Sequence, residues 1–322
     1  RFADWIPVAT TTMVDLHTIP ISPVAAATAV LAPLGAYALL RLLRYAVPGA
    51  HRQPRFCFKD RTVLITGASS GLGNAMAREF YARGARLILV ARSIDKLKEL
   101  CEQLKASGPG HEPVYAYLDL AEPDKAEELA KLSHNGKIDC LVNNAGISMR
   151  GSIMEADLSV HRKVFETNYF GQVAVTRALL PFIPDDGCIV VTSSLQGRFA
   201  LPYRSAYSAS KHAISAFFDS LRSEERFGLH ILTVFAGYIQ TELGANALKL
   251  SERSARGGDS KTRGGLTPED AARIIADATV ARRSEITPAP LAHRTMIFLR
   301  WLWPDLLSFL LHKRAQAEMK EQ

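Results

Sequence analysis

The stretch YSASK at residues 207–211 brings together two side chains that can exchange protons. On a helix, Tyr207 and Lys211 lie on one face because they are four residues apart. A free tyrosine has a pKa of about 10 and is a weak acid–base catalyst at neutral pH, whereas a neighbouring ammonium favours the phenolate and lowers that pKa. The spacing indicates a tuned proton donor, although such a pair alone more often marks an ordinary helix surface.

Two further polar residues precede this pair. Ser194 lies thirteen residues before Tyr207, in the run VTSSLQG, and Asn168 lies in ETNYFG. A serine hydroxyl can hydrogen-bond a substrate oxygen as that oxygen gains negative charge. We expect Asn168 to hold a water molecule that connects Lys211 with solvent. Together the four residues predict acid–base chemistry at an oxygen atom.

A glycine-rich loop, TGASSGLG, follows the first apolar run and opens a helical stretch, with Gly67, Gly71 and Gly73 in GxxxGxG spacing. Glycines let the backbone turn tightly and approach a pyrophosphate, whose charge is then received by the amides of a helix N-terminus. The next apolar run ends in ILVARS, so Arg92 and Ser93 stand where a dinucleotide site usually has an acid. Because an arginine attracts a 2′-phosphate, the sequence favours NADP(H) over NAD(H).

A nicotinamide that carries hydride and a tyrosine that exchanges a proton are the two parts needed to interconvert a carbonyl and a secondary alcohol. The positive ring of the oxidised cofactor would add to the effect of Lys211 on the pKa of Tyr207. The sequence therefore predicts an NADP(H)-dependent oxidoreductase.

From Arg61 onward, short apolar runs alternate with helical stretches, as is typical of a parallel α/β sheet. The runs predicted as strands are TVLIT, RLILVA, VYAYLDL, IDCLVNN, CIVVTSS and HILTVFA, with SEIT as a seventh. Helices are predicted near 72–83, 93–106, 124–134, 158–182, 204–227 and 268–283. Runs that are apolar on both sides of the pleat indicate helices on both faces. The predicted fold is α/β, a Rossmann-type doubly wound parallel sheet of about seven strands.

Composition excludes several other classes of protein. The 322 residues carry a formal charge of +7, but no dense basic run is interleaved with aromatic residues, so nucleic acid is not an expected partner. The cysteines show neither CxxC spacing nor nearby histidines, so we predict no metal site. They are Cys57, Cys101, Cys140 and Cys188.

The N-terminal part contains an uncharged stretch from Ile21 to Leu40. About 20 such residues make about 30 Å of helix, enough to cross a bilayer. Basic residues follow at Arg41 and Arg44, which places the larger C-terminal part in the cytosol by the positive-inside rule. We predict a membrane anchor over 21–47, and a buried or interfacial helix stays open because Pro23 and Pro33 weaken the segment.

These patterns divide the chain into an N-terminal segment (1–20), the anchor (21–47), a linker (48–60), a catalytic domain (61–290) and a C-terminal extension (291–322). Within the catalytic domain, a loop after Gly244 contains Lys249, Arg253, Arg256, Lys261 and Arg263. It is either a solvated loop or a clamp for an anionic head group. The apolar extension either lies in a membrane interface, covers an apolar substrate pocket or packs on the sheet edge.

The motifs TGASSGLG, YLDL with Asp119, NNAG at 143–146, Asn168, Ser194 and YSASK resemble, in order and spacing, those of the short-chain dehydrogenase/reductase family. The resemblance spans about residues 60 to 290 and implies that Asn168, Ser194, Tyr207 and Lys211 are catalytic. It also implies that Asp119 contacts adenine, that Asn143 braces the central strand and that Thr241 holds the nicotinamide carboxamide. One departure is Ala236-Gly237, where the family usually has proline-glycine. The implied cofactor-binding residues are Gly67, Ser69, Ser70, Gly71, Leu72, Gly73, Arg92, Ser93, Asp119, Leu120, Asn144, Ala145, Gly146, Tyr207, Lys211, Gly237, Ile239 and Thr241.

Further runs around these motifs, together with the N-terminal and C-terminal apolar segments, resemble those of membrane-bound members of the family. They imply a lipid-like carbonyl substrate such as acyl- or alkyl-dihydroxyacetone phosphate, and a homodimer or homotetramer. They also imply a location in the endoplasmic-reticulum membrane, with the peroxisomal membrane as the alternative. Two other functions stay open, a hydroxysteroid or retinoid dehydrogenase and a non-catalytic NADPH-binding regulatory protein.

Overall fold

The computed structural model describes residues 22–47, 50–108, 110–124, 126–224, 228–244, 246–248 and 265–320. The chain forms two compact units, Arg1–Pro48 and Gly49–Gln322. The first contains helix α1 (Pro23–Ala46), which has Pro33 in its interior. Among the helices in the described ranges, none is both long enough and apolar enough to cross a membrane. The anchor over 21–47 stays a prediction.

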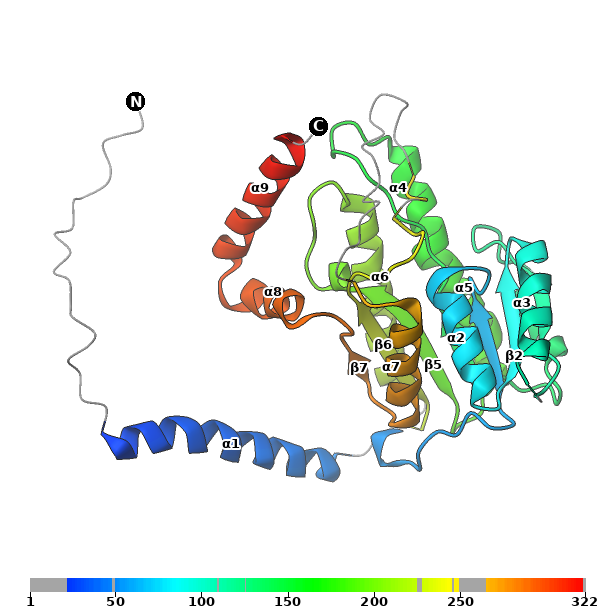
Figure 1. Cartoon of the computed structure of the whole chain (residues 1–322), viewed down its shortest axis with the longest axis horizontal. Helices are drawn as coiled ribbons and strands as arrows, with labels where there is room; N and C mark the ends of the chain where they lie inside the picture. The colour runs from blue at the N-terminus through cyan, green and yellow to red at the C-terminus, as the bar shows by residue number, and fades with distance from the viewer. Residues whose placement is uncertain are drawn as a thin grey trace. The chain divides into compact units, whose positions relative to one another are not determined.

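The second unit is built on a parallel sheet with strand order β3-β2-β1-β4-β5-β6-β7 (Figure 1). The seven predicted strands are confirmed. Their β-branched and leucine-rich runs suit strands that are covered on both faces. The strands are β1 (Thr62–Thr66), β2 (Arg86–Ala91), β3 (Val114–Tyr117), β4 (Cys140–Asn143), β5 (Cys188–Ser194), β6 (His230–Ala236) and β7 (Glu285–Ile286).

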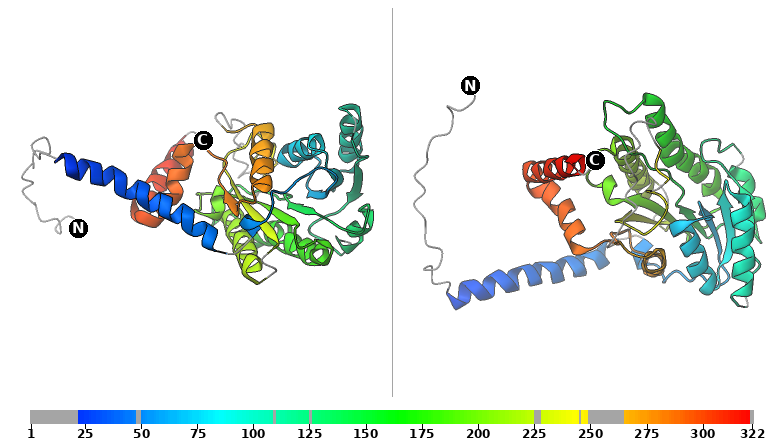
Figure 2. Two further views of the ribbon diagram at one scale, coloured as in Figure 1. Left: turned by 90° about the horizontal axis from the view of Figure 1, so that it is seen from below. Right: turned by 45° about the horizontal axis from the view of Figure 1, so that its top comes forward.

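Alternate residues of β1, β2, β4 and β5 enter two separate hydrophobic cores. In β1, Val63 and Ile65 pack with helices on one face, whereas Leu64 packs with helices on the other. The first face is covered by α2 (Gly71–Ala82), α3 (Ile94–Ala106) and α7 (Pro268–Val280), and the second by α5 (Gly171–Leu179) and α6 (Ser205–Glu224) (Figure 1 and Figure 2). The unit therefore has the three layers of a doubly wound fold, as predicted.

Two predicted helices differ from expectation. The segment 124–134 forms a 3-10 helix, η3 (Ala126–Leu132), instead of an α-helix. The single helix expected over 158–182 consists of α4 (Leu158–Phe165), a π-helical turn η4 (Glu166–Phe170), α5 and a short 3-10 turn η5 (Leu180–Phe182). Periodicity alone cannot reveal such a turn, because the π-helix inserts one residue without changing the apolar stripe on either side.

The C-terminal extension forms two further helices, α8 (Leu291–Leu302) and α9 (Pro304–Lys320), and α8 follows β7 closely. Leu307 of α9 is buried against Leu195 and Phe199, which lie just after β5. In Figure 1 the two helices lie on the β7 side of the sheet, away from α3. The extension is thus part of the compact unit Gly49–Gln322.

Candidate active site

A cavity of about 540 Å³ lies at the carboxyl ends of the parallel strands, where ligands bind in folds of this type. The cavity is lined by the last residues of four strands, Thr66, Ala91, Ser194 and Ala236. Of the residues predicted from sequence, those that line it are Gly67, Ser69, Ser70, Gly71, Leu72, Arg92, Ser93, Asp119, Leu120, Asn144, Ala145, Gly146, Ser194, Tyr207, Lys211, Gly237, Ile239 and Thr241. Gly73 and Asn168 do not line it and lie behind the wall.

The glycine-rich loop takes the shape that a pyrophosphate site needs. Gly67 has a φ of +68°, and a Cβ there would lie 2.8 Å from the Cα of Ala145. A Cβ on Gly73 would collide with the carbonyl oxygen of Gly67 and lie 2.6 Å from Nδ2 of Asn144. Only glycine fits at both positions. The loop therefore packs on NNAG and leads straight into the N-terminus of α2, so the residues present fit a dinucleotide.

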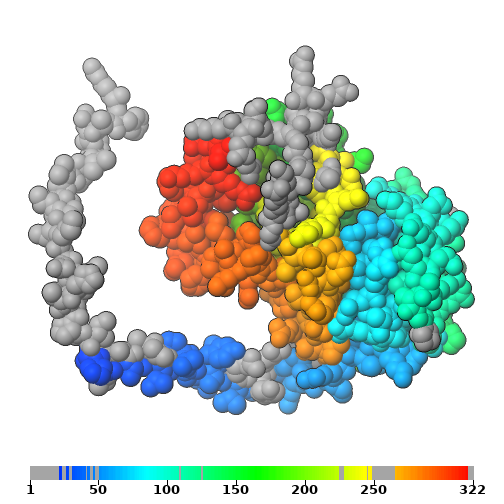
Figure 3. All heavy atoms as spheres, in the orientation of Figure 1, coloured from blue at the N-terminus to red at the C-terminus, as the bar shows by residue number. Residues whose placement is uncertain are grey.

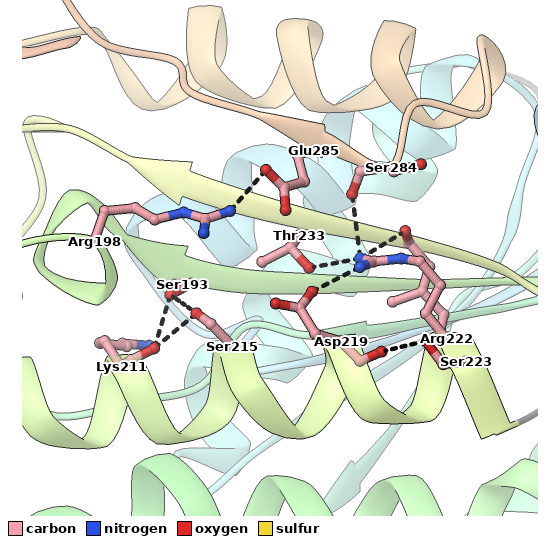
Figure 4. A network of polar contacts seen from close by, with 11 residues as sticks. Ser193, Arg198, Lys211, Ser215, Asp219, Arg222, Ser223, Thr233, Ser284 and Glu285 are labelled. Atoms are coloured by element: carbon pink, nitrogen blue, oxygen red, sulfur yellow. Dashed lines mark hydrogen bonds and ion pairs between the residues drawn. The ribbon is translucent and has the colours of Figure 1, made fainter. Parts of the chain in front are cut away.

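Tyr207 and Lys211 lie on α6 and face the cavity. The Nζ of Lys211 lies 5.7 Å from the centroid of the Tyr207 ring and donates a hydrogen bond of 2.8 Å to the carbonyl oxygen of Thr192. The backbone carbonyl of Lys211 accepts hydrogen bonds from Ser193 (3.2 Å) and Ser215 (2.7 Å), as Figure 4 shows. This part of α6 is thus fixed against the end of β5.

The pKa values of this pair differ from the sequence-based expectation. Burial raises the pKa of Tyr207, while its hydrogen bond with Ser194 and the charges of Arg150 and Arg204 oppose that rise. Burial also lowers the pKa of Lys211 to about 8. Without a cofactor, burial is the largest influence on Tyr207 and raises its pKa, so Lys211 does not lower that pKa by itself, and the joint effect of Lys211 and the oxidised cofactor stays a prediction.

Asn168 lies in the π-helical turn and is completely buried. Its Oδ1 accepts a hydrogen bond of 2.8 Å from the backbone N–H of Ile147, and its Nδ2 donates to the carbonyl oxygen of Ile147 (2.9 Å) and to Oγ of Ser210 (3.0 Å). Ser210 in turn donates to the carbonyl oxygen of Tyr207 (2.8 Å). Asn168 thereby joins the segment after NNAG to the helix of Tyr207, and its role in holding a water stays a prediction.

The loops next to the sheet hold the rest of the predicted set. Asn143 donates a 2.9 Å hydrogen bond to Thr176 of α5, which ties β4 to that helix. At the far end of the cavity, Nη1 of Arg92 lies 3.8 Å from Oδ2 of Asp119, and the arginine side chain is 60% exposed. After β6, the N–H of Gly237 bonds the carbonyl oxygen of Pro288 (3.2 Å), so the Ala236-Gly237 turn is held without the proline.

Sequence reasoning missed a basic cluster near Tyr207. Arg204 and Arg314 line the cavity, and each donates a 3.2 Å hydrogen bond to the hydroxyl of Tyr238. Burial opposes ionisation of Tyr238, but the two arginine charges outweigh it and lower its pKa. His293 of α8 stacks edge-on to Tyr238 with ring centroids 5.7 Å apart. These residues come from four separate places, the loop before α6, the turn after β6, α8 and α9, so no local pattern in the sequence could unite them.

The basic clamp expected in the 244–266 loop stays a prediction. Its basic residues Lys249, Arg253, Arg256, Lys261 and Arg263 all lie outside the described residues. Near the start of that loop, Leu248 pairs with Met149 in an isolated parallel bridge. Arg150 follows that bridge and also lines the cavity.

The sheet order, the glycine loop and a tyrosine–lysine pair at the strand ends define a dinucleotide-binding oxidoreductase fold. A family model described as short chain dehydrogenase matches residues 61–250. The chain belongs to the short-chain dehydrogenase/reductase family, whose members are oxidoreductases.

Relatives in this family match the chain over most of its length. The chain is 40% identical over 315 residues to Dehydrogenase/reductase SDR family member 7B of Xenopus tropicalis, covering 95% of this chain and 98% of that protein. It is 38% identical to the member 7B of Mus musculus (90% of each chain). It is 42% identical to Dehydrogenase/reductase SDR family protein 7-like of Anopheles gambiae (80% of this chain, 83% of the other).

Solved structures share the fold. A short chain dehydrogenase/reductase from Burkholderia phymatum in complex with NAD superposes with a TM-score of 0.70 at 24% identity, covering 78% of this chain and 96% of the other. An alcohol dehydrogenase from Thermococcus sibiricus complexed with 5-hydroxy-NADP superposes with a TM-score of 0.62 at 26% identity, covering 71% and 96%.

Proposed function

We propose that the chain is an NADP(H)-dependent enzyme that interconverts a ketone and a secondary alcohol on a lipid-like substrate. One observation carries this proposal. Ser194, Tyr207 and Lys211 line the same cavity as the glycine loop, and the cavity continues to the apolar residues of α8 and α9. A cofactor-binding regulatory protein would not need this acid–base set.

The glycine loop and the turn after β6 would hold the cofactor. Gly67 to Leu72 would take the pyrophosphate, and Arg92 at the end of β2 would take a 2′-phosphate. The bound nicotinamide supplies hydride chemistry. Of the two solved structures, the Thermococcus sibiricus enzyme carries an NADP derivative and the Burkholderia phymatum protein carries NAD. The choice of NADP(H) therefore rests on Arg92.

The proton is handled by this chain's own residues. The raised pKa of Tyr207 keeps its hydroxyl protonated at neutral pH, so Oη can donate a proton to the substrate oxygen during reduction. The hydroxyl of Ser194, which hydrogen-bonds Tyr207, would hold the same oxygen in place. Lys211 lines the cavity beside them, and its positive charge would stabilise the phenolate that is left.

The cavity wall supports a substrate with an anionic head and an apolar tail. Arg204 and Arg314 provide charge on either side of the Tyr238 hydroxyl. Met296, Leu310 and Leu311 provide apolar surface from α8 and α9. Acyl- or alkyl-dihydroxyacetone phosphate has this chemistry, whereas a steroid or a retinoid lacks the charged group.

The test is NADPH consumption by the purified chain over a panel of dihydroxyacetone-phosphate lipids, steroids and retinals. We expect turnover of the phosphorylated ketones and its loss in Tyr207→Phe, with NADPH binding retained in that variant. Unchanged turnover by Tyr207→Phe would contradict the proposed role of Tyr207 as the proton donor. Turnover of steroids or retinals alone would replace the proposed substrate by the alternative.

A second variant tests the head-group residues. Arg314→Met keeps a flexible, unbranched side chain and removes its charge, so KM for a phosphorylated ketone should rise about tenfold to a hundredfold. KM for an uncharged ketone of equal chain length should change by less than about threefold. Equal effects on the two substrates would exclude Arg314 from head-group binding.

We also propose association with an intracellular membrane, the endoplasmic reticulum first and the peroxisome second, with a cytosolic catalytic unit and pairing into a homodimer or homotetramer. The support is the apolar surface of α1, where Leu31, Leu40 and Leu42 are all more than 60% exposed. Fractionation of cells that express the tagged chain, followed by protease protection, tests the location, and sedimentation velocity tests the assembly.

A further inference from the structure

The two C-terminal helices have apolar residues on two sides, and only one side has a partner within the described residues. On the inner side, Met296, Ile297 and Leu299 of α8 pack with Phe199 and Leu201 of the catalytic unit. On the outer side, Leu291, Phe298, Trp301 and Leu302 are 60–79% exposed. A helix at the surface of a soluble domain usually carries a single apolar stripe, so the second stripe needs a partner.

The outer residues share one side of α8 because they are spaced by three, four and seven, with Arg294 and Thr295 between Leu291 and Phe298. Phe298 and Trp301 lie with ring centroids 6.2 Å apart. The strip continues past the turn between the helices through Trp303 and Phe309, which are 57% and 53% exposed. We call these six residues the α8–α9 apolar strip: Leu291, Phe298, Trp301, Leu302, Trp303 and Phe309.

The residues around the strip are mainly basic. Apart from Arg314, which lines the cavity, α8 and α9 contain the basic residues Arg294, Arg300, Lys313 and Lys320 against the acids Asp305 and Glu318. The Nζ of Lys313 lies 4.6 Å from the centroid of Phe309, so the ammonium of this lysine makes a cation–π contact with a ring of the strip. Exposed tryptophans next to lysine and arginine are typical of a surface that meets lipid head groups.

The strip also lies next to the cavity. Leu310 follows Phe309, lines the cavity and is 40% exposed, so an apolar residue of the cavity wall is the immediate neighbour of the strip in the sequence. Space-filling spheres show α8 and α9 projecting from one side of the catalytic unit (Figure 3). A molecule leaving an apolar phase at the strip would therefore meet the wall that leads to Tyr207.

We propose that the α8–α9 apolar strip docks the catalytic unit on the surface of a bilayer that contains anionic lipids. The inference rests on the proposed function for its substrate, because a lipid-like ketone would then enter the cavity from the membrane beside Leu310. The strip lies in the interface with its basic residues among the head groups, and no helix has to span the bilayer for this contact.

The experiment measures co-sedimentation of the full chain with vesicles of 70% phosphatidylcholine and 30% phosphatidylserine, without substrate or cofactor. Phe298→Asp/Trp301→Asp should bind these vesicles at least about tenfold more weakly than the native chain, because two anchoring rings are replaced by negative charge. A matched control is Tyr117→Asp/Leu132→Asp, which alters two exposed apolar residues at the other edge of the sheet and should bind normally.

Folding is checked by circular dichroism and by turnover of a short water-soluble ketone, since neither Phe298 nor Trp301 lines the cavity. The variant Leu34→Asp/Leu40→Asp in α1 distinguishes vesicle binding through α1 from vesicle binding through the α8–α9 apolar strip. If this α1 variant abolishes binding while the α8 variant binds normally, the inference is overturned. It is also overturned if the native chain does not bind, or if the α8 variant splits a larger assembly in vesicle-free solution, because the strip is then an interface between copies.

A second readout locates the contact. The chain has three tryptophans, Trp5, Trp301 and Trp303. In a Trp5→Phe background, brominated lipids should quench most of the fluorescence, because both remaining rings lie in the strip. Pelleting without quenching would overturn the inference. Because these measurements contain no cofactor or ketone, they stand or fall separately from the proposed reaction, which the NADPH panel tests.

Discussion

The two ends of the parallel sheet both bury polar and charged side chains but satisfy them in different ways. At the amino end, Asp139 accepts hydrogen bonds from Arg61 (2.6 Å) and from the N–H of Thr62 (2.8 Å), and Arg61 also reaches Asp186 (2.7 Å). At the carboxyl end, Lys211 is buried and meets no carboxylate among the described residues, only the carbonyl oxygen of Thr192. At the amino end each charge is paired with an opposite charge, whereas at the carboxyl end the ammonium of Lys211 lies at the cavity without a carboxylate partner among the described residues.

The difference explains what each end can do. Paired charges hold the strand starts together and have little capacity to react. A buried cation without a counter-ion has a shifted pKa and can stabilise a charge that appears during a reaction. Figure 4 shows a second paired charge on α6, where Arg222 donates hydrogen bonds to Asp219 (2.6 Å) and Thr233 (3.1 Å).

The largest expected effect comes from Tyr207→Phe at the carboxyl end. Removing the hydroxyl deletes the proton donor and should lower kcat by at least about a thousandfold, within the range of general acid catalysis. The free energy of unfolding should change by less than about 1 kcal/mol, since the ring remains. Steady-state kinetics and urea denaturation of the same preparation measure both. A variant that loses stability and keeps turnover would reverse the comparison.

At the amino end, Asp139→Ala should have the opposite profile. It leaves the Arg61 guanidinium and the Thr62 N–H without their acceptor, so the free energy of unfolding should fall by about 2–4 kcal/mol. Below the melting transition, kcat should stay within about twofold of native, because the substitution lies at the other end of the sheet. A large fall in kcat in the folded variant would show that the two ends are coupled.

The pH dependence of stability sharpens the comparison at Lys211. Burial lowers its pKa to about 8, whereas an unfolded lysine titrates near about 10.4. The unfolded chain therefore holds more protons between these values, and the stability of the native protein rises with pH in that window. Relative to Lys211→Met, the gain by pH 10 should be on the order of 2 kcal/mol. Parallel curves of unfolding free energy against pH would mean that Lys211 titrates normally.

The smallest effect concerns the ion pair at the carboxyl end. Arg92 and Asp119 are 3.8 Å apart and Arg92 is largely exposed, so the pair adds little stability. Its use is for binding, and Arg92→Ala should raise KM for NADPH about tenfold while KM for NADH changes less than about twofold. If both constants rise together, Arg92 does not select the 2′-phosphate.

The sequence predicted the parts of the molecule that depend on local pattern. The seven strands, the glycine loop and the approach of Ser194 to Tyr207 follow from apolar runs and from residues at strand ends, where parallel topology brings them together. The cluster of Arg204, Tyr238 and Arg314 could not be predicted, because its members come from a loop, a turn and the last helix. The raised pKa of Tyr207 was missed because burial cannot be measured from spacing.

The turn at Glu166–Phe170 restricts how this protein can change in length. A π-helical turn holds one residue more than an α-helix needs, so deleting any one residue there would let the segment close into continuous α-helix. The flanking helices α4 and α5 would keep their relative orientation, and the residues left inside the turn would rotate relative to them. Asn168 would swing away from Ile147 and Ser210 while the apolar stripe stayed intact. Families that keep Asn168 at this position should tolerate substitutions here far better than single-residue deletions.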